Sequence, residues 1–452
     1  CHPIIAMQMQ RGLQRGAKMI VVDPKRTDMA KKADIFLQIP PGANIKTLNT
    51  IMNVIIAENL QDDEFIKNYA HGYEYLKEAV KDFTPERFER ETGIKKELII
   101  EAARMYAKAG AAAICYTMGI TQFSDGTSNV FSLSNLAVLT GNLGKKGAGV
   151  NPLRGQNNVQ GACDMGALPN VIPAGAVNSP YAQEQARKVW HFELNPVPGF
   201  KLTQAPDKMD SGELKVLYVY GENPVMSDPW TEHFVHAVRH LDCFIVQDLF
   251  FTESAHKADV VLPAAGWGEK DGTFINTSRR VQRTRKASEP VSGVEPDWKV
   301  VCNIANRMGL EGFDFASPEQ IWNELRELMP KFFGGISYYR LGKLGGISWP
   351  CPDEEHPGTP VLYADHKSML PGGKFRFAPV LYVDDKEGRA KAEAEFRAKM
   401  NIPDGYPVGS GALSEVPDEV YPCLFTTGRK VYHYHTGTMT RECPALEYGA
   451  GI

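Results

Sequence analysis

The sequence lacks the local cysteine spacing that binds zinc or an iron–sulfur cluster. Its eight cysteines are scattered along 452 residues, and no two of them are separated by only two residues. Zinc ribbons, ferredoxin-type clusters and thioredoxin chemistry therefore lack their usual motif here. The scatter indicates a fold that does not depend on disulfides, and we expect a cytoplasmic location.

Long apolar runs and an excess of basic residues are also missing. No apolar stretch approaches the roughly 18 residues of a membrane helix, so we expect no membrane span. The 50 Lys and Arg residues against 54 Asp and Glu give a net charge of −4, which argues against nucleic acid as a partner. Neither G-x-G-x-x-G after a strand nor G-x-x-x-x-G-K-[ST] occurs, so nicotinamide and P-loop chemistry are poor explanations.

What is present is the composition of a globular protein, with 43% hydrophobic, 23% charged and 10% aromatic residues. The length fits about three domains of ordinary size. The chain opens on Cys1 without an initiator Met and stops directly after a dense polar motif. We therefore expect it to be a piece of a longer protein.

Strand and helix patterns alternate along most of the chain. Short β-branched runs indicate strands, and apolar residues at intervals of three and four indicate helices. This alternation favours an α/β fold whose parallel sheets are covered by helices on both faces. The predicted strands lie at 18–23, 34–39, 111–117, 214–220, 244–246 and 259–262, and the predicted helices at 45–55, 86–91, 95–109, 127–139 and 386–399.

Two further regions carry weaker patterns. Trp322, Leu325 and Leu328 have nearly helical spacing, and we expect them in a core. Residues 330–420 are rich in Gly, Pro and charge, so we expect loops and insertions there, apart from the one helix.

Polar residues follow four of the predicted strands, at 23–26, 118–122, 221–223 and 247–248. Any one of them could simply lead the chain out to solvent. In open parallel sheets, however, ligands bind outside the carboxyl ends of the strands. Four instances in two α/β segments favour one extended ligand with several polar groups.

The densest polar segment is 149–166, with five amides, four glycines and one arginine. Amides offer a donor and an acceptor together, glycine permits close backbone approach, and the forked cation of Arg154 suits a carboxylate. A surface loop would also be polar. The shortage of Lys, Glu and Ser favours a buried, shaped site instead.

This segment resembles the signature of the metal-dependent formate dehydrogenases in the molybdopterin oxidoreductase (dimethyl-sulfoxide reductase) superfamily. The resemblance implies a catalytic subunit that oxidises formate reversibly to CO₂ by two electrons. It also implies an electron-transfer partner subunit, an iron–sulfur or flavin protein. The other matching pieces are His2-Pro3-Ile4, Val22-Asp23-Pro24, 139–144, 258–263, Trp267-Gly268-Glu269 and Thr427-Gly428-Arg429.

The resemblance further implies two pyranopterin guanine dinucleotides around one Mo or W ion. Arg154 would be the active-site arginine, and Gln156 would help to hold the pterin. Acidic groups suit guanine, whose edge donates two parallel hydrogen bonds, while basic residues and backbone amides suit diphosphates. One dinucleotide would contact Asp23, Lys25, Arg26, Gly42, Asn44, Met118 and Gln122, the other Gly221, Glu222, Asn223, Ser227, Gln247, Asp248 and Asp297, and Arg429, His433 and His435 would complete the cage.

The chain departs from the family pattern in three places. Asn223 stands where relatives often have an acidic residue, so a guanine contact there would be neutral. Lys25-Arg26 reverses the order of a relative, which leaves open the residue that contacts phosphate. The Cys or selenocysteine that ligates the metal, and the four cysteines of a [4Fe–4S] domain, would precede Cys1. We therefore expect no metal ligand in this chain.

The implied architecture is two Rossmann-like parallel-sheet domains that bind cofactor, parts of a discontinuous α+β domain, and the start of a C-terminal β-barrel domain. The expected ranges are 1–156 for the first domain, 157–266 with about 297–317 for the second, 267–296 with 318–385 for the discontinuous domain, and 386–452 for a link and the truncated capping domain.

Two other interpretations are open. The first is another member of the superfamily, such as a nitrate reductase or a formylmethanofuran dehydrogenase, and the run 154–166 argues against both. The second is a non-catalytic electron-transfer relative, like the large iron–sulfur subunit of respiratory complex I. Such relatives lose the pterin contacts, whereas this chain keeps nearly all of them.

Overall fold

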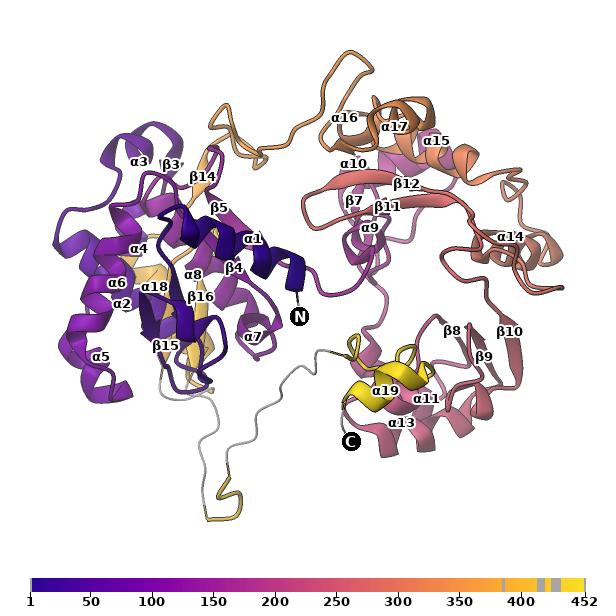
Figure 1. The fold of residues 1–452 in the computed structure, drawn as a ribbon, viewed down its shortest axis with the longest axis horizontal. Coiled ribbons are helices and arrows are strands. Elements are labelled where there is room, and N and C mark those ends of the chain that lie inside the picture. The colour runs from indigo at the N-terminus through magenta and orange to yellow at the C-terminus, as the bar shows by residue number, and fades with distance from the viewer. Residues whose placement is uncertain (1, 384–386, 413–418, 424–431, 451–452) are drawn as a thin grey trace. The chain divides into compact units, whose positions relative to one another are not determined.

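The computed structural model of the chain describes residues 2–383, 387–412, 419–423 and 432–450. The chain divides into two compact units, shown in Figure 1. The N-terminal unit comprises His2–Leu153 with Val361–Thr427, and the C-terminal unit comprises Arg154–Pro360 with Gly428–Ile452. Arg429 lies outside the described residues. The finer division into four domain ranges stays a prediction.

The N-terminal unit is mainly helical, and the short strands among its described residues form four separate parallel pairs: β1–β2, β4–β5, β3–β14 and β15–β16. Its elements are α1 (Pro3–Gln14), β1 (Ile20–Val22), β2 (Ile35–Leu37), α2 (Asn44–Ala57), α3 (Asp63–Tyr69), β3 (Ala70–His71), α4 (Tyr73–Val80), α5 (Pro85–Thr92), α6 (Lys96–Ala107), β4 (Ala113–Tyr116), α7 (Met118–Thr121), α8 (Gly126–Leu139), β5 (Gly149–Pro152), β14 (Phe375–Arg376), β15 (Val380–Val383), α18 (Arg389–Met400) and β16 (Gly409–Ala412), with a 3₁₀ turn at Ala30–Lys32.

Helix α2 is the centre of this unit's core. Ile45, Leu48, Met52 and Ile55 recur at intervals of three and four and are all buried. The helix packs against α6 and α8, whose apolar faces close the same core (Figure 1). The predicted helix at 45–55 is confirmed, because the apolar stripe that identified it is the stripe that packs.

Residues 375–412 return to this core rather than forming loops. The Asn135 amide nitrogen on α8 donates to the carbonyl of Ala378, and its oxygen accepts from the Ala378 N–H at 2.9 Å. Asn49 on α2 donates to the carbonyl of Val380 at 2.9 Å. The expectation of loops and insertions at 330–420 holds for 349–374, which contains no helix or strand, but it is wrong where short helices and strands form at 330–348, 375–383 and 409–412. The short strands of this range are paired with partners far away in the sequence, and local composition does not reveal such partners.

The C-terminal unit contains a parallel sheet of order β10-β9-β8 and an antiparallel sheet of order β11-β12-β13. Its elements are α9 (Val159–Asp164), β6 (Val171–Ile172), β7 (Gly175–Ala176), α10 (Pro180–Gln185), α11 (Ala205–Asp210), β8 (Val216–Tyr220), α12 (Pro224–Ser227), α13 (Thr231–Ala237), β9 (Cys243–Asp248), β10 (Val260–Pro263), β11 (Gly272–Ile275), β12 (Arg280–Thr284), α14 (Asp297–Arg307), α15 (Pro318–Leu328), α16 (Pro330–Phe333), α17 (Tyr338–Leu344), β13 (Ile347–Ser348) and α19 (Pro444–Ala450), with a π-helical turn at Ala186–Trp190 and 3₁₀ turns at Leu202–Gln204, Val238–His240 and Ala255–Lys257.

Each sheet of this unit has its own core. On the parallel sheet, Phe244 and Val246 of β9 pack with Phe234 of α13 and Met209 of α11. The antiparallel sheet packs against α15, and the predicted core positions Trp322, Leu325 and Leu328 are buried, with 3%, 7% and 1% exposure. That prediction is confirmed.

The predicted fold class is confirmed only in its coarse form, as a mixture of helices with small parallel sheets. Among the described residues no sheet closes into a barrel. Residues 432–443 form turns and are followed by α19, so the described residues from 432 onward contain no strand of the expected C-terminal barrel. Among all the described residues, no helix is both long enough and apolar enough to cross a membrane.

Replacing Asn135 by Ala is expected to destabilise the N-terminal unit by about 2–4 kcal/mol. The change leaves both the N–H and the carbonyl of the buried Ala378 without their partner, and each buried unpaired group costs about 1–3 kcal/mol. Urea unfolding followed by far-UV circular dichroism measures the difference.

The matched control is Asn68→Ala, because Asn68 is exposed on α3 and makes none of these buried contacts. This control should change the free energy of unfolding by less than about 0.5 kcal/mol. Equal effects of the two substitutions would show that the Asn135 bonds do not hold the 375–383 segment.

Candidate functional site

The loop that carries Arg154 is docked onto the antiparallel sheet by its backbone. The Arg154 N–H donates to the Thr277 hydroxyl at 2.9 Å. Four residues later, the Asn158 side chain accepts from the Ile275 N–H at 2.9 Å, at the end of β11. Asn158 has a φ of 59°, a left-handed conformation that asparagine tolerates, and helix α9 begins directly after it. The loop is thus fixed at both ends.

The Arg154 side chain points toward α9. Its Nη1 lies 3.8 Å from the Cys163 sulfur. The next residue, Asp164, accepts from Gln160 at 2.8 Å and from the Trp349 indole at 2.9 Å. Burial raises the pKa of the Asp164 carboxyl, while Arg154 and Arg279 act in the opposite direction. Gln160 and Trp349 thus fix the Asp164 carboxyl, and the Arg154 guanidinium lies beside the neighbouring Cys163 sulfur.

The C-terminal segment covers the same loop through Tyr434 and His435, so the structure brings His435 together with the Arg154 region. A Cβ atom at Gly155 would collide with the His435 ring, so only glycine allows the ring to lie there. The Asn157 N–H donates to the Tyr434 hydroxyl. His433 is held separately, by Thr440 at 3.1 Å and by Glu447 at 3.4 Å.

The second group of predicted residues lies at the carboxyl ends of β8 and β9. Gly221 has a φ of 65°, and a Cβ atom there would meet open space. Its N–H donates to the carbonyl of Gln247 at 2.9 Å, which ties the two strand ends together. Glu222 is exposed beside it. The parallel sheet predicted for this part of the chain is present, since β8 pairs with β9 in parallel.

Asn223 is buried, and its amide is used within the protein. Its nitrogen donates to Glu253 at 2.7 Å, and its oxygen accepts from the Ser254 N–H and hydroxyl at 3.1 and 2.7 Å. Ser227 donates to the Asn223 carbonyl at 3.1 Å. Asn223 and Ser227 therefore shape the turn, and the group that Asn223 holds in place is the Glu253 carboxylate.

Gln247 and Asp297 form a buried chain of polar groups. The Gln247 nitrogen donates to Asp297 at 2.8 Å, and its oxygen accepts from the Tyr218 hydroxyl. Asp297, the first residue of α14, also pairs with Lys270. Burial lowers the pKa of Lys270, and the nearby Glu269 carboxylate opposes that shift. Gln247 and Asp297, the two predicted residues, thus stabilise the end of β9 through buried hydrogen bonds.

Asp248 offers its carboxyl group at the end of β9. One oxygen accepts from the backbone N–H groups of Leu249 and Phe250, at 2.6 and 3.3 Å. Burial raises the pKa of this carboxyl, and the two N–H donors oppose the shift. Because both donors use the same oxygen, the other oxygen is available for a ligand with N–H groups.

A pocket of about 170 Å³ opens beside these strand ends. Asn223, Glu253 and His256 line it together with Arg441 from the C-terminal segment. The hydrogen bond from Asn223 and the charges of Arg441 and His256 lower the pKa of Glu253, so this carboxyl is ionised at neutral pH. Sequence reasoning missed Glu253 and Lys270, because neither follows a strand or falls within a motif.

The predicted residues of the N-terminal unit also follow strand ends. Asp23 comes directly after β1, and its carboxylate accepts a hydrogen bond from the Lys25 backbone N–H at 2.7 Å. The side chains of Lys25 and Arg26 are exposed. Gly42, with a φ of 84°, turns the chain into α2, which begins at Asn44.

Helix α2 has no acidic residue in its first turn, so its N-terminal N–H groups suit an anion. Met118 is the first residue of the short helix α7 after β4, Gln122 directly follows that helix, and both are exposed. The N-terminal unit thus brings exposed cations, a helix N-terminus and an exposed amide to the ends of its strands.

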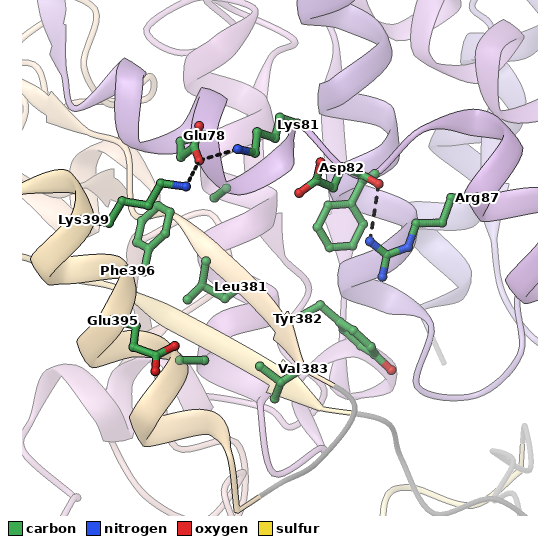
Figure 2. Close-up of a pocket in the computed structure, with 13 residues that line it drawn as sticks. Glu78, Lys81, Asp82, Arg87, Leu381, Tyr382, Val383, Glu395, Phe396 and Lys399 are labelled. Atoms are coloured by element: carbon green, nitrogen blue, oxygen red, sulfur yellow. Dashed lines mark hydrogen bonds and ion pairs between the residues drawn. The ribbon is translucent and has the colours of Figure 1, made fainter.

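Another pocket in the N-terminal unit contains none of the predicted site residues. Its volume is about 360 Å³, and it lies between α4, β15 and α18 (Figure 2). Glu78 accepts from Lys81 and Lys399 there, at 2.7 and 2.5 Å, and apolar side chains such as Phe396 line its wall (Figure 2). The opposing charges are already paired, so this pocket does not explain the polar strand ends.

Known proteins resemble the chain over nearly its whole length. It is 47% identical over 447 residues to the F420-dependent formate dehydrogenase subunit alpha of Methanocaldococcus jannaschii, covering 98% of this chain and 61% of that protein. It is 39% identical over 449 residues to formate dehydrogenase H of Escherichia coli, covering 98% of this chain and 58% of that protein. The chain thus spans about six tenths of the length of these relatives.

The fold also has a likeness among solved structures. Acetylene hydratase from Pelobacter acetylenicus matches 90% of this chain and 55% of its own, with a TM-score of 0.64 and 20% sequence identity. At that identity the likeness concerns the fold alone. Residues 1–307 match the family described as molybdopterin oxidoreductase. Since that match covers more than half of the chain and includes both groups of strand-end residues, the chain belongs to the molybdopterin oxidoreductase family.

Proposed function

We propose that this chain is part of the catalytic subunit of a formate dehydrogenase, which oxidises formate reversibly to CO₂ with release of two electrons and one proton. The observation that carries the proposal is the docked loop that places the Arg154 guanidinium beside the Cys163 sulfur and within electrostatic reach of the Asp164 carboxyl. The names of the relatives at 47% and 39% identity support it, since both are formate dehydrogenases.

The family implies a molybdopterin cofactor, and we propose that its form is Mo or W with two pyranopterin guanine dinucleotides. The residues present fit such a group. Gly221 leaves open space at the end of β8, and Asp248 has a carboxyl oxygen for guanine N–H groups. The N-terminus of α2 and the exposed Lys25 and Arg26 suit a diphosphate. When bound, the metal centre supplies the acceptor for the two electrons.

The remaining predicted residues divide between contact and support. Glu222 and Asp248 would contact one dinucleotide, and Glu253, held by Asn223, would face the same pocket. Gln247 and Asp297 are buried, so they would act by fixing the strand end. Gln156 and His435 lie in and against the Arg154 loop, where the pterin would be held. The metal-ligating Cys or selenocysteine and a [4Fe–4S] cluster would belong to a part of the protein outside this chain.

Arg154 would bind the formate carboxylate and orient its C–H bond. A guanidinium presents two parallel N–H groups, and a carboxylate accepts both, so the pair fixes the direction of the substrate as well as its position. The arginine stays protonated throughout, so its contribution is positioning and electrostatic stabilisation rather than proton transfer.

The electrons would leave through an electron-transfer subunit, an iron–sulfur or flavin protein. The relatives from methanogens are named alpha subunits, which supports an assembly of several chains. The cytoplasmic location stays a prediction.

One prediction of this proposal concerns the substitution Arg154→Lys in the whole enzyme. Lysine keeps the charge but loses the two parallel donors, so formate oxidation should fall by roughly a hundredfold or more, as when an aligned donor is removed from other enzymes. Formate-dependent reduction of a viologen dye measures activity, and metal analysis should find Mo or W near the wild-type amount.

The control is Arg307→Lys, because Arg307 is exposed at the end of α14, outside the site. It should retain both activity and metal. Full formate activity in Arg154→Lys would refute the proposed role of Arg154, and Mo- or W-loaded wild-type enzyme without formate activity would refute the proposed function.

A further prediction of this proposal concerns the substitution Asp248→Asn. The amide keeps an oxygen for the Leu249 and Phe250 N–H groups but places a donor where guanine also donates, so retention of the guanine dinucleotide should weaken about tenfold or more. Guanine nucleotide released by acid treatment, measured per chain, reports retention.

Asp242→Asn is the matched control, because Asp242 is exposed next to the opposite end of the same strand. It should retain the nucleotide. If Asp248→Asn holds as much guanine nucleotide as Asp242→Asn, then Asp248 does not contact the base.

A further inference from the structure

Three histidines surround Asp210 on the C-terminal unit, and none of these residues is a predicted cofactor contact. One Asp210 oxygen lies 3.0 Å from Nδ1 of His240 and 3.9 Å from Nδ1 of His236. The other oxygen lies 2.8 Å from Nε2 of His233. The cluster therefore places three imidazole nitrogens around a single carboxylate.

The local fold explains why these four side chains meet. His233, His236 and His240 are spaced by three and four residues, which places them on one face of α13 and the 3₁₀ turn that continues it. Phe234 of α13 packs against Met209, the neighbour of Asp210 on α11. This packing holds the end of α11 against the histidine face.

The cluster is open to ions in solution. The exposed fractions are 63% for the His236 side chain, 45% for His240 and 34% for Asp210, whereas His233 is 17% exposed. The His233 ring also packs against Trp230, with ring centroids 4.5 Å apart. The side chains of Asp210, His236 and His240 thus reach solvent, whereas the His233 ring is largely covered and packs against Trp230.

We propose that Asp210, His236 and His240 bind a divalent transition-metal ion of the zinc type, with His233 positioning the carboxylate. Imidazole nitrogen and carboxylate oxygen are both common zinc ligands, at about 2.0–2.2 Å. The three ligand atoms already lie within 4.8 Å of one another. Tetrahedral ligands at those bond lengths are separated by about 3.3 Å, so rotation of the exposed His236 ring completes the site, and water takes the fourth position.

His233 has the role of an outer hydrogen-bond partner. It donates to the carboxylate oxygen that the metal does not use, which fixes the orientation of the other oxygen. Partners of this kind typically change metal affinity by about 10–100-fold when they are removed.

The bound ion would join α11 to the end of α13. Both helices pack on the parallel sheet that carries Asn223, Gln247 and Asp248. Because an ion that binds only the folded state stabilises it, zinc should raise the temperature of unfolding. Hydrogen bonds between Asp210 and the histidines would hold the helices together without any metal, and the experiment must separate these two cases.

The experiment titrates Zn²⁺ into the intact protein after chelator treatment, with isothermal calorimetry as the readout. Co²⁺ is titrated in parallel, because its visible absorption reports tetrahedral nitrogen and oxygen ligands. One site should weaken at least a hundredfold in His240→Gln and in Asp210→Asn, and about tenfold in His233→Gln. The exposed His191 of the same unit gives the control His191→Asn, which should bind as the wild type does.

Two outcomes overturn the proposal. Equal Zn²⁺ affinity in the wild type and in the His236→Gln/His240→Gln double variant means that the cluster binds no metal and other groups account for the heat. Full affinity in Asp210→Asn means that a surface histidine pair binds the ion without the carboxylate. Formate activity and circular dichroism should match the wild type in every variant, which separates loss of the ion from loss of the fold and from the proposed function.

Discussion

Within each of the two units, hydrogen bonds from amide side chains hold irregular segments in place. Asn135 pairs with both backbone groups of Ala378, Asn158 accepts from the end of β11, and Asn223 binds Glu253 and Ser254. Each joins segments that are distant in the sequence and is at least partly buried. A buried polar group is tolerated only when it is paired, so each of these bonds permits one arrangement and penalises the others. The strand ends and the Arg154 loop therefore have defined shapes.

The two units offer complementary chemistry at their strand ends. The N-terminal unit presents exposed cations and the N-terminus of α2, whereas the C-terminal unit presents the carboxylates of Asp248 and Glu253. Phosphate groups and the donor edge of a base require these opposite environments. Burial raises the pKa of Asp248, whereas the hydrogen bond from Asn223 and the nearby Arg441 lower that of Glu253, so the two carboxylates have different surroundings. They are therefore not interchangeable.

Sequence patterns predicted the elements whose stability is local or whose apolar face is continuous. Helix α2 lies at Asn44–Ala57, where apolar spacing predicted 45–55, and β8 lies at Val216–Tyr220, where a β-branched run predicted 214–220. The strand-end residues were predicted because ligands of open parallel sheets bind outside the carboxyl ends of the strands. Glu253 and Lys270 were missed because their roles come from pairing with Asn223 and Asp297, which no spacing in the sequence reveals. The strands after residue 370 were missed for the same reason.

The contacts of Asn135 and Asn49 also affect how the N-terminal unit behaves toward other chains. A strand with unpaired backbone groups can recruit a strand from a second molecule, which begins edge-to-edge aggregation. Here the N–H of Ala378 and the carbonyls of Ala378 and Val380 already bond to side chains from two helices. Two asparagines thus occupy backbone positions that an incoming strand would need, while Pro379 between Ala378 and Val380 offers no N–H and β16 already pairs with β15.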